Sequence, residues 1–219
     1  MHAYTHTEPV CGLVILAAGA SRRMGHPKQL VKCWGETLLN RCLRIAREAG
    51  LDKGVLVLGA QAARIRDSLP ADVFPVLENA DWAEGMASSI RCGLRGLLAR
   101  YDQLDAVILL VSDQPFLEPG LLRDMVRVYR ETGKKIVYCR YEVGQGVPVL
   151  FDRSLFDQLD RLQGDTGARP LIKAHLQQST AVYFPLGNRD VDTEQDLDDL
   201  MLQYGKGGPP PGIKSVPDA

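Results

Sequence analysis

Residues 12–30 read GLVILAAGASRRMGHPKQL, and this stretch decides the fold of the chain. It begins with an apolar run, 12–17, that is typical of a buried strand, and then changes at once to a loop of small residues and cations. Residues 106–115, AVILLVSDQP, repeat this arrangement, because an apolar run again ends in polar side chains. Polar loops that directly follow buried strands indicate an α/β protein whose ligands bind at the carboxyl edge of a sheet.

The remainder of the chain alternates short apolar runs with amphipathic segments, which predicts a three-layer α/β fold with a mostly parallel sheet. The run 106–111 is the most strand-like, so we expect it at the centre of the sheet. The other predicted strands are 12–17, 54–58, 73–77, 135–139, 147–151 and 181–184. The predicted helices are 38–49, 61–68, 87–100, 121–131, 154–162, 168–175 and 193–203, the last capped by Thr193 with Asp196 at its third position.

The length of 219 residues suits one folded domain, which we expect over residues 11–204. A flexible extension is expected over 1–10, and a disordered Gly/Pro-rich tail over 205–219. The first ten residues lack the basic start and apolar core of a signal peptide. No apolar run approaches the roughly 20 residues that cross a bilayer. Five scattered cysteines without CxxC spacing argue against a disulfide framework or a zinc site, so we expect a cytoplasmic protein.

The charge balance excludes some partners. The chain carries 26 Lys and Arg against 27 Asp and Glu, a net charge of −1. Such a balance gives no electrostatic case for binding nucleic acid or an anionic membrane, and we expect neither partner. Any phosphate binding must therefore come from a local cluster of cations.

The loop after the first strand supplies such a cluster. Small residues at 17–19 let backbone N–H groups approach a ligand closely, and Ser21, Arg22, Arg23 and Lys28 add donors and cations. A triphosphate needs both kinds of group. The loop matches neither the GxxxxGK[ST] P-loop nor GxGxxG, which disfavours the ATPase and dehydrogenase classes. Taken alone, it could equally be a solvated basic loop.

Two carboxylates follow two other strands. Asp113 lies in SDQP after 106–111, and Asp192 lies in RDVDT before the last helix. Mg²⁺ commonly takes one or two protein carboxylates together with substrate phosphates. Each aspartate alone could be a turn or helix-cap residue, as could Asp190. Together with the cationic loop they predict one metal–triphosphate site.

The motifs LAAGxSxRMGxxK, NxxWxxGMxxS, DQP, GDxGAR and DxDTxxDL follow one another between residues 16 and 197. In this order they resemble the molybdenum cofactor cytidylyltransferases and, more distantly, the guanylyltransferase of the same pathway. The resemblance covers nearly the whole predicted domain. It implies a Rossmann-like nucleotide-diphospho-sugar transferase fold and Mg²⁺ as cofactor.

The resemblance also implies roles for individual residues. The magnesium positions of the family match Asp113 and Asp192. Its catalytic positions match Arg23, Lys28 and Asp113. The nucleotide-binding positions are Leu16, Ala17, Ala18, Gly19, Ser21, Arg23, Lys28, Asn79, Gly85, Met86, Ser88 and Ser89. The acceptor-side candidates are Gln145, Asp165 and Arg169. A helix start beside a cation suits a second phosphate, although Asp165 and Arg169 could equally belong to an ordinary capped helix.

The family resemblance favours CTP as donor, because its cytidylyltransferases read AAG at 17–19 whereas its guanylyltransferases read LAGG. The implied acceptor is molybdenum-bound molybdopterin, the implied products are molybdopterin cytosine dinucleotide and pyrophosphate, and a molybdoenzyme or maturation factor is an expected client. One departure concerns the acceptor: Val147 stands where the family often has His in Gly-His-Pro.

Three alternatives stay open from the sequence. A cytidylyltransferase for a sugar or polyol phosphate, of the methylerythritol phosphate type, shares AAGxxRMG and PKQ, but SDQP replaces the DAARP-like stretch expected there. The guanylyltransferase of the molybdenum cofactor pathway is the second alternative. The third, of another class, is a noncatalytic cofactor-binding chaperone, which would have no need of two metal carboxylates beside Lys28.

Overall fold

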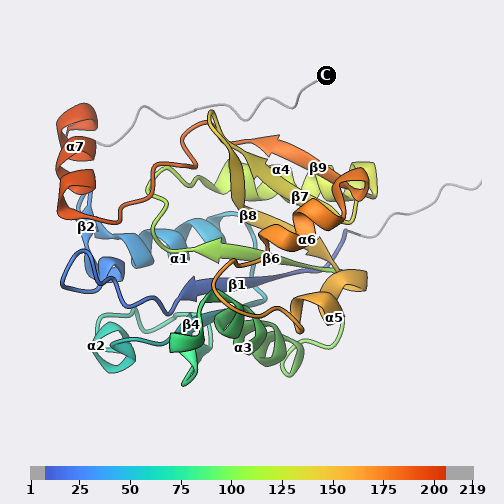
Figure 1. The fold of residues 1–219 in the computed structure, drawn as a ribbon, viewed down its shortest axis with the longest axis horizontal. Helices are drawn as coiled ribbons and strands as arrows, with labels where there is room; N and C mark the ends of the chain where they lie inside the picture. The colour runs from blue at the N-terminus through green and yellow to red at the C-terminus, as the bar shows by residue number, and fades with distance from the viewer. Residues whose placement is uncertain (1–7, 206–219) are drawn as a thin grey trace, which may run out of the picture.

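The computed structural model of the chain describes residues 8–205. Of the segments expected to be flexible or disordered, residues 1–7 and 206–219 lie outside the described part. The end of the expected N-terminal extension contacts the domain, since the Val10 N–H donates to the Asp105 carboxylate at 2.8 Å. The described chain forms the three-layer α/β fold expected from the sequence, with one sheet between two layers of helices (Figure 1).

A seven-stranded sheet forms the middle layer, in the order β5-β4-β1-β6-β8-β7-β9. Its strands are β1 (Cys11–Ala17), β4 (Gly54–Leu58), β5 (Val76–Glu78), β6 (Ala106–Val111), β7 (Ile136–Arg140), β8 (Gln145–Asp152) and β9 (Ser179–Tyr183). The central position predicted for β6 is confirmed. Strand β8 runs antiparallel to both of its neighbours, β6 and β7, and the other pairings are parallel, so the sheet is mixed but mostly parallel.

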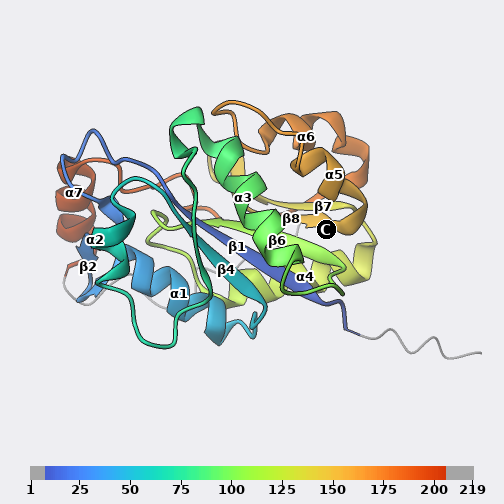
Figure 2. The ribbon, with the colours of Figure 1, turned by 90° about the horizontal axis from the view of Figure 1, so that it is seen from below.

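The helices cover both faces of the sheet. Helices α1 (Leu38–Glu48) and α4 (Pro119–Thr132) lie on one face, and α3 (Met86–Leu98), α5 (Phe156–Leu159) and α6 (Arg169–Ala174) on the other (Figure 2). Short 3-10 helices occur at Lys28–Leu30, Trp82–Glu84, Arg153–Leu155 and Leu176–Gln178. Helix α2 (Ala62–Arg66) follows β4, and α7 (Glu194–Tyr204) lies at one end of the molecule (Figure 1).

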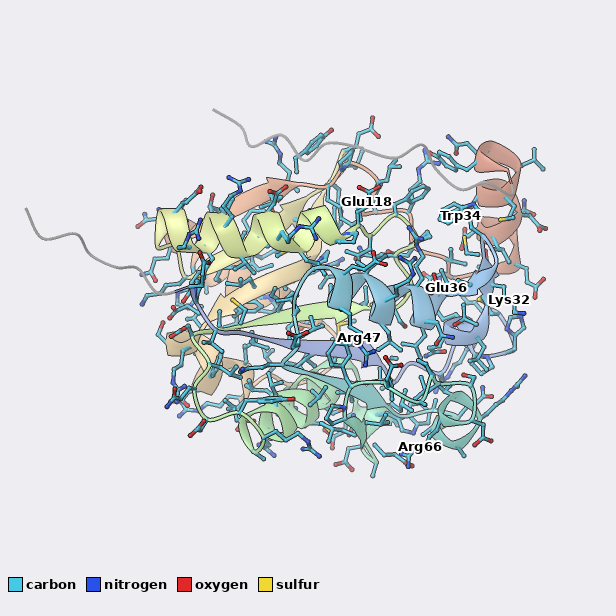
Figure 3. All side chains as sticks on the ribbon, turned by 180° about the vertical axis from the view of Figure 1, so that it is seen from behind. Lys32, Trp34, Glu36, Arg47, Arg66 and Glu118 are labelled. Carbon is cyan, nitrogen blue, oxygen red and sulfur yellow. The ribbon has the colours of Figure 1, made fainter. Side chains whose placement is uncertain are left out.

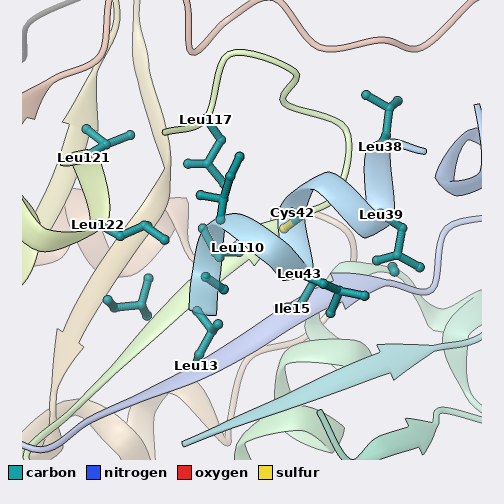
Figure 4. Packing of buried hydrophobic residues seen from close by; sticks show 14 of the residues in the cluster. Leu13, Ile15, Leu38, Leu39, Cys42, Leu43, Leu110, Leu117, Leu121 and Leu122 are labelled. Atoms are coloured by element: carbon teal, nitrogen blue, oxygen red, sulfur yellow. The ribbon is translucent and has the colours of Figure 1, made fainter. Parts of the chain in front are cut away.

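Alternate residues of β1 point to the two layers, as the period of a strand requires. Leu13 and Ile15 pack with α1 residues such as Leu39 and Leu43 (Figure 4). Val14 and Leu16 belong to the cluster on the α3 side. Because both faces are covered, the apolar run at 12–17 is continuous rather than alternating.

Several features differ from the prediction. The helix predicted at 154–162 is a 3-10 turn at Arg153–Leu155, capped by the Asp152 carboxylate, followed by the short α5, and α2 is shorter than the predicted 61–68.

Strand β5 begins at Val76 rather than 73, because Pro75 has no N–H and contributes only its carbonyl, which accepts from Leu56 at 3.0 Å. A small hairpin of β2 (Lys32–Cys33) and β3 (Glu36–Thr37) was not predicted. Its turn places Trp34 and Gly35 at positive φ, 53° and 85°, and a tryptophan there hides the usual turn signal.

The start of α7 agrees with the prediction. The Thr193 hydroxyl accepts from the Asp196 N–H at 3.2 Å, and the Asp196 carboxylate accepts from the Thr193 N–H at 2.7 Å. This reciprocal capping box fixes the backbone that carries Asp192. No helix of the described residues 8–205 is long and apolar enough to span a membrane.

Helix α3 approaches the sheet through Gly93. A Cβ atom there would lie 2.3 Å from Cγ1 of Val14 and 2.9 Å from Cγ2 of Val57, both in buried strands. We expect Gly93→Ala to lower the free energy of unfolding by about 1–3 kcal/mol, because the methyl overpacks this contact. The measurement is urea denaturation followed by circular dichroism.

Gly120→Ala is the matched control, because a Cβ at this position of α4 meets nothing within 4 Å. It should leave stability unchanged or raise it by up to about 1 kcal/mol, through helix propensity. Equal stability of the two variants would contradict the close approach of α3 to the sheet.

Candidate active site

A cleft of about 530 Å³ opens where β1 and β6 end, a size that suits a nucleotide. It lies at the carboxyl ends of these parallel strands, where α/β sheets bind ligands. We call it the strand-end cleft. Its lining consists of Leu16 to Arg23, Lys28, Gln29, Trp82 to Met86, Ser89, Val111 to Asp113, and Asp165.

The ammonium of Lys28 lies between two carboxylates. Its Nζ bonds Oδ2 of Asp113 and also Oδ1 of Asp192, the latter at 2.9 Å. Arg23 adds a second cation, with Nη2 at 2.8 Å from Oδ2 of Asp192. Asp113 follows β6 and Asp192 precedes α7, and the N–H of Val191 donates to the Asp113 carbonyl at 3.0 Å. The structure thus brings together the three parts that the sequence predicted: the cationic loop and both carboxylates.

This pairing shifts the pKa values of Lys28 and Asp192. Burial disfavours the charged form of Lys28, but the charges and hydrogen bonds of Asp113 and Asp192 outweigh it and raise the Lys28 pKa above its ordinary value. Burial also works against a charged Asp192, yet the hydrogen bonds and charges of Lys28 and Arg23 lower its pKa. The ammonium and the Asp192 carboxylate are therefore both charged near neutral pH.

Asp190 behaves differently, although it is only two residues from Asp192. The residue is exposed as a whole, but desolvation of its carboxyl and the charges of Asp113 and Asp192 raise its pKa to about 7. It is therefore only partly charged near neutral pH. Asp113 and Asp192 are the better pair of ligands for a cation.

The two carboxylates fit a divalent metal. Oδ1 of Asp113 is buried and has no hydrogen-bond partner within the described residues, so one ligand oxygen is uncommitted. Residues 8–205 contain no cluster of three or more His, Cys, Asp or Glu side chains that could hold a metal ion. Mg²⁺ suits such a site, because substrate phosphates and water complete its coordination.

The loop at 18–23, which follows β1 and is called the cleft loop, is held in shape by Gln29. This glutamine is 1% exposed. Its Nε2 donates to the carbonyls of Ala17 at 2.9 Å and Gly19 at 3.1 Å. The Ser21 hydroxyl accepts from the Lys28 N–H at 3.0 Å and contacts Oε1 of Gln29 at 3.4 Å. Sequence reasoning did not single out Gln29 as a positioning residue. Its position next to Lys28 is no signal of this role, because only the folded chain brings the two carbonyls to its side chain.

The nucleotide-binding positions predicted at 79–89 are divided in the structure. Gly85, Met86 and Ser89 line the cleft. Asn79 and Ser88 are buried and do not line it: Nδ2 of Asn79 donates to the hydroxyls of Ser88 at 2.8 Å and Ser89 at 3.0 Å. The placement of Asn79 and Ser88 supports the turn before α3.

Of the three acceptor-side candidates, the structure brings only Asp165 to the cleft. Its Oδ1 accepts from the Met86 N–H at 3.0 Å, and the Gly164 carbonyl accepts from the Ala87 N–H at 3.1 Å. Asp165 therefore caps α3 from another segment. Arg169, at the start of α6, and Gln145, at the start of β8, are exposed and lie outside the lining.

Val147 replaces the family's frequent histidine, and its backbone joins a buried network beside the SDQP motif. The Val147 carbonyl accepts from Nε2 of Gln114 at 3.1 Å and from the Tyr141 hydroxyl at 2.5 Å. Nε2 of Gln114 also donates to the Gly187 carbonyl at 2.7 Å. This position therefore braces the segment next to Asp113 through its main chain.

A family model described as "MobA-like NTP transferase domain" matches residues 13–180 of the chain. Nicotine blue oxidoreductase of Paenarthrobacter nicotinovorans is 28% identical over 200 residues, which cover 87% of this chain and 93% of that protein. The purine catabolism protein PucB of Bacillus subtilis (strain 168) is 27% identical over 195 residues, which cover 84% of this chain and 93% of PucB. The family match includes β1, the cleft loop and β6.

Among solved structures, Rv0371c from Mycobacterium tuberculosis H37Rv is 34% identical, with a TM-score of 0.76, and the match covers 90% of this chain and 100% of that one. A second structure of Rv0371c is a complex with manganese, with 33% identity and a TM-score of 0.71 over 89% of this chain and 99% of that one. A 4-diphosphocytidyl-2C-methyl-D-erythritol synthase from Anaerococcus prevotii DSM 20548 has a TM-score of 0.68 at 16% identity, over 90% of this chain and 97% of its own. That likeness shows the fold alone, the expected nucleotide-diphospho-sugar transferase type.

The role of Gln29 can be measured. Gln29→Leu should lower the free energy of unfolding by about 1–3 kcal/mol, because the Ala17 and Gly19 carbonyls lose their donor. It should also weaken nucleoside triphosphate binding, because the loop loses its shape. Urea denaturation and calorimetric titration are the two measurements. Gln177→Leu, at an exposed position, is the control. If Gln29→Leu matched this control in its free energy of unfolding and in its affinity for the triphosphate, Gln29 would not position the loop.

Proposed function

The chain belongs to the MobA-like NTP transferase family, and we propose that it transfers CMP from CTP to the phosphate of molybdenum-bound molybdopterin. The products would be molybdopterin cytosine dinucleotide and pyrophosphate. One observation carries the proposal: Lys28, Arg23 and Asp113 line one cleft beside the AAG loop at the end of β1, and Asp192 forms ion pairs with both cations.

The proposed reaction needs no protein nucleophile. A terminal phosphate oxygen of the acceptor attacks the α-phosphorus of CTP, and the bond between that phosphorus and the α,β-bridging oxygen breaks. Pyrophosphate leaves with the electron pair. A phosphate monoester is already anionic near neutral pH, so catalysis consists of positioning and charge neutralisation. Lys28 and Arg23 supply fixed positive charge for the triphosphate.

The proposed metal is Mg²⁺, held by Asp113 and Asp192. When bound, it would neutralise phosphate charge and orient the triphosphate. The uncommitted Oδ1 of Asp113 and the charged state of Asp192 support this assignment. The manganese complex of Rv0371c supports a divalent ion without choosing between the two metals.

The choice of CTP rests on the AAG loop. Ala18 is 6% exposed, and a Cβ atom added at Gly59 would lie 2.8 Å from the Ala18 methyl. The methyl thus packs against Gly59, directly after β4, and Ala18 also belongs to the lining of the strand-end cleft. Cytosine is a small base, and an alanine at this lining position leaves less room for a purine than a glycine would.

A screen of the four nucleoside triphosphates against two acceptors tests the proposal. Molybdenum-bound molybdopterin and methylerythritol phosphate would each be offered with Mg²⁺, and pyrophosphate would be measured. We expect release above background with CTP and the pterin. Release only with the polyol phosphate would move the assignment to that acceptor class, and no release in any combination would favour a noncatalytic cofactor carrier.

The carboxylates give the first prediction about turnover. Asp113→Asn and Asp192→Asn should each lower the rate of pyrophosphate release by at least about 100-fold, because each removes a charge from the metal and phosphate site. The fold should persist, which circular dichroism would check. Asp198→Asn, on the exposed side of α7, should keep the wild-type rate. A variant at 113 or 192 with wild-type turnover would remove that residue from the site.

The second prediction about turnover concerns the choice of base. Wild-type protein should prefer CTP over GTP, and Ala18→Gly should narrow that preference, because it takes a methyl from the lining of the cleft. A single methyl changes discrimination by about 1–3 kcal/mol, so the shift should be partial. Competition with equal CTP and GTP is the measurement. A wild-type preference for GTP would contradict the cytidylyl assignment and leave nucleotidyl transfer standing.

A further inference from the structure

Lys28 holds together the two carboxylates that are proposed to bind the metal. Its ammonium contacts Oδ2 of Asp113 and Oδ1 of Asp192, and the lysine side chain is only 19% exposed. Arg23 contacts the other oxygen of Asp192, but its side chain is 69% exposed. The largely shielded lysine, rather than the exposed arginine, is therefore the main counterion of the pair.

An ammonium and a divalent ion compete for such oxygens. Two cations at contact distance repel each other, although a carboxylate oxygen has a second lone pair for a hydrogen bond. The uncommitted Oδ1 of Asp113 offers a metal one free ligand, whereas Oδ1 of Asp192 contacts Lys28 and its Oδ2 contacts Arg23. A metal that uses both aspartates therefore competes with the lysine, and charge repulsion favours displacement of the ammonium.

A displaced Lys28 has one evident new partner. The residue lines the strand-end cleft together with the loop at 16–23, so its ammonium can turn from the aspartates toward an anion there. A triphosphate is such an anion, and a flexible four-carbon stem allows the movement. The Ser21 hydroxyl holds the Lys28 backbone at 3.0 Å, so the side chain can move while the loop keeps its shape.

We propose that Lys28 is a displaceable cation that couples metal binding to triphosphate binding. Without metal it neutralises Asp113 and Asp192, and when a divalent ion takes those oxygens its ammonium is released to the phosphates. Each ligand then promotes the other, because coupling between two binding equilibria is reciprocal. This inference rests on the metal site of the proposed function.

Chemical labelling of the wild-type protein tests the release. Acetic anhydride would be applied in trace amounts with and without Mn²⁺, with no nucleotide present, and acetylation would be read for each lysine by peptide mass spectrometry. We expect Mn²⁺ to raise acetylation of Lys28 several-fold relative to Lys32, which is exposed on β2. Unchanged or lower labelling of Lys28 in saturating Mn²⁺ would overturn the proposal.

Metal affinity gives a second, independent readout, by electron paramagnetic resonance of free Mn²⁺ without nucleotide. Lys28→Met should bind Mn²⁺ at least about tenfold more tightly than wild type, because the competing cation is gone. Arg23→Met should gain less Mn²⁺ affinity, since Arg23 contacts only Asp192. Arg100→Met, at an exposed position just after α3 and outside the cleft lining, should bind Mn²⁺ as wild type does. Weaker or equal binding by Lys28→Met would contradict the proposal.

Loss of Lys28 removes the counterion of Asp113 and leaves Asp192 with Arg23 alone, so the variant needs a check on folding. Its melting temperature without metal should lie below that of wild type, and Mn²⁺ should raise it by more than it raises the wild-type value. If Mn²⁺ raised both melting temperatures by the same amount, this result would contradict displacement of Lys28. These measurements need no turnover, so they are independent of the transferase assay. If that assay failed while Mn²⁺ still displaced Lys28, the proposed reaction would be overturned and the role of Lys28 would remain.

Discussion

Two negative charges that lie close together need a shared counterion, and the candidate active site depends on this constraint. Asp113 and Asp192 are 79 positions apart, on different elements, and are joined through the ammonium of Lys28. The backbone assists, because Val191 donates to the Asp113 carbonyl and the Asp196 carboxylate accepts from the N–H groups of Asp192 and Thr193. Charge pairing and capping together set the geometry of the two carboxylates.

The position of α7 matters for the same reason, because this helix follows Asp192 directly. Leu200 is its one fully buried residue, so its placement depends on contacts near its ends. Phe116 packs edge-on against both Trp34 and Tyr204, with ring centroids 5.8 and 5.0 Å apart, and Nε1 of Trp34 donates to the Gly205 carbonyl at 3.1 Å. Figure 3 shows Trp34 beside α7. The β2–β3 hairpin, outside the predicted elements, thereby supports Asp192, the proposed metal ligand.

The sequence predicts most of the fold because buried strands such as β1 and β6 leave a strong apolar signal. It misses what tertiary contacts decide: the direction of β8, the hairpin around Trp34, and the start of β5 at Val76. At the site it predicts the charged residues, whose chemistry is specific to phosphate and metal. It could not show that Gln29 holds the loop or that Asp165 caps α3, since both depend on backbone groups that only the folded chain brings near.

We propose that Asp113 and Asp192 share one divalent ion while Lys28 contacts the triphosphate. A crystal structure with Mn²⁺ and a nonhydrolysable CTP analogue tests this arrangement most directly, because anomalous scattering locates the metal. We expect one manganese peak within coordinating distance of both carboxylates and of phosphate oxygens, with the Lys28 ammonium on the phosphates. A manganese ion bound elsewhere, or Lys28 still between the aspartates with nucleotide in the cleft, would contradict it.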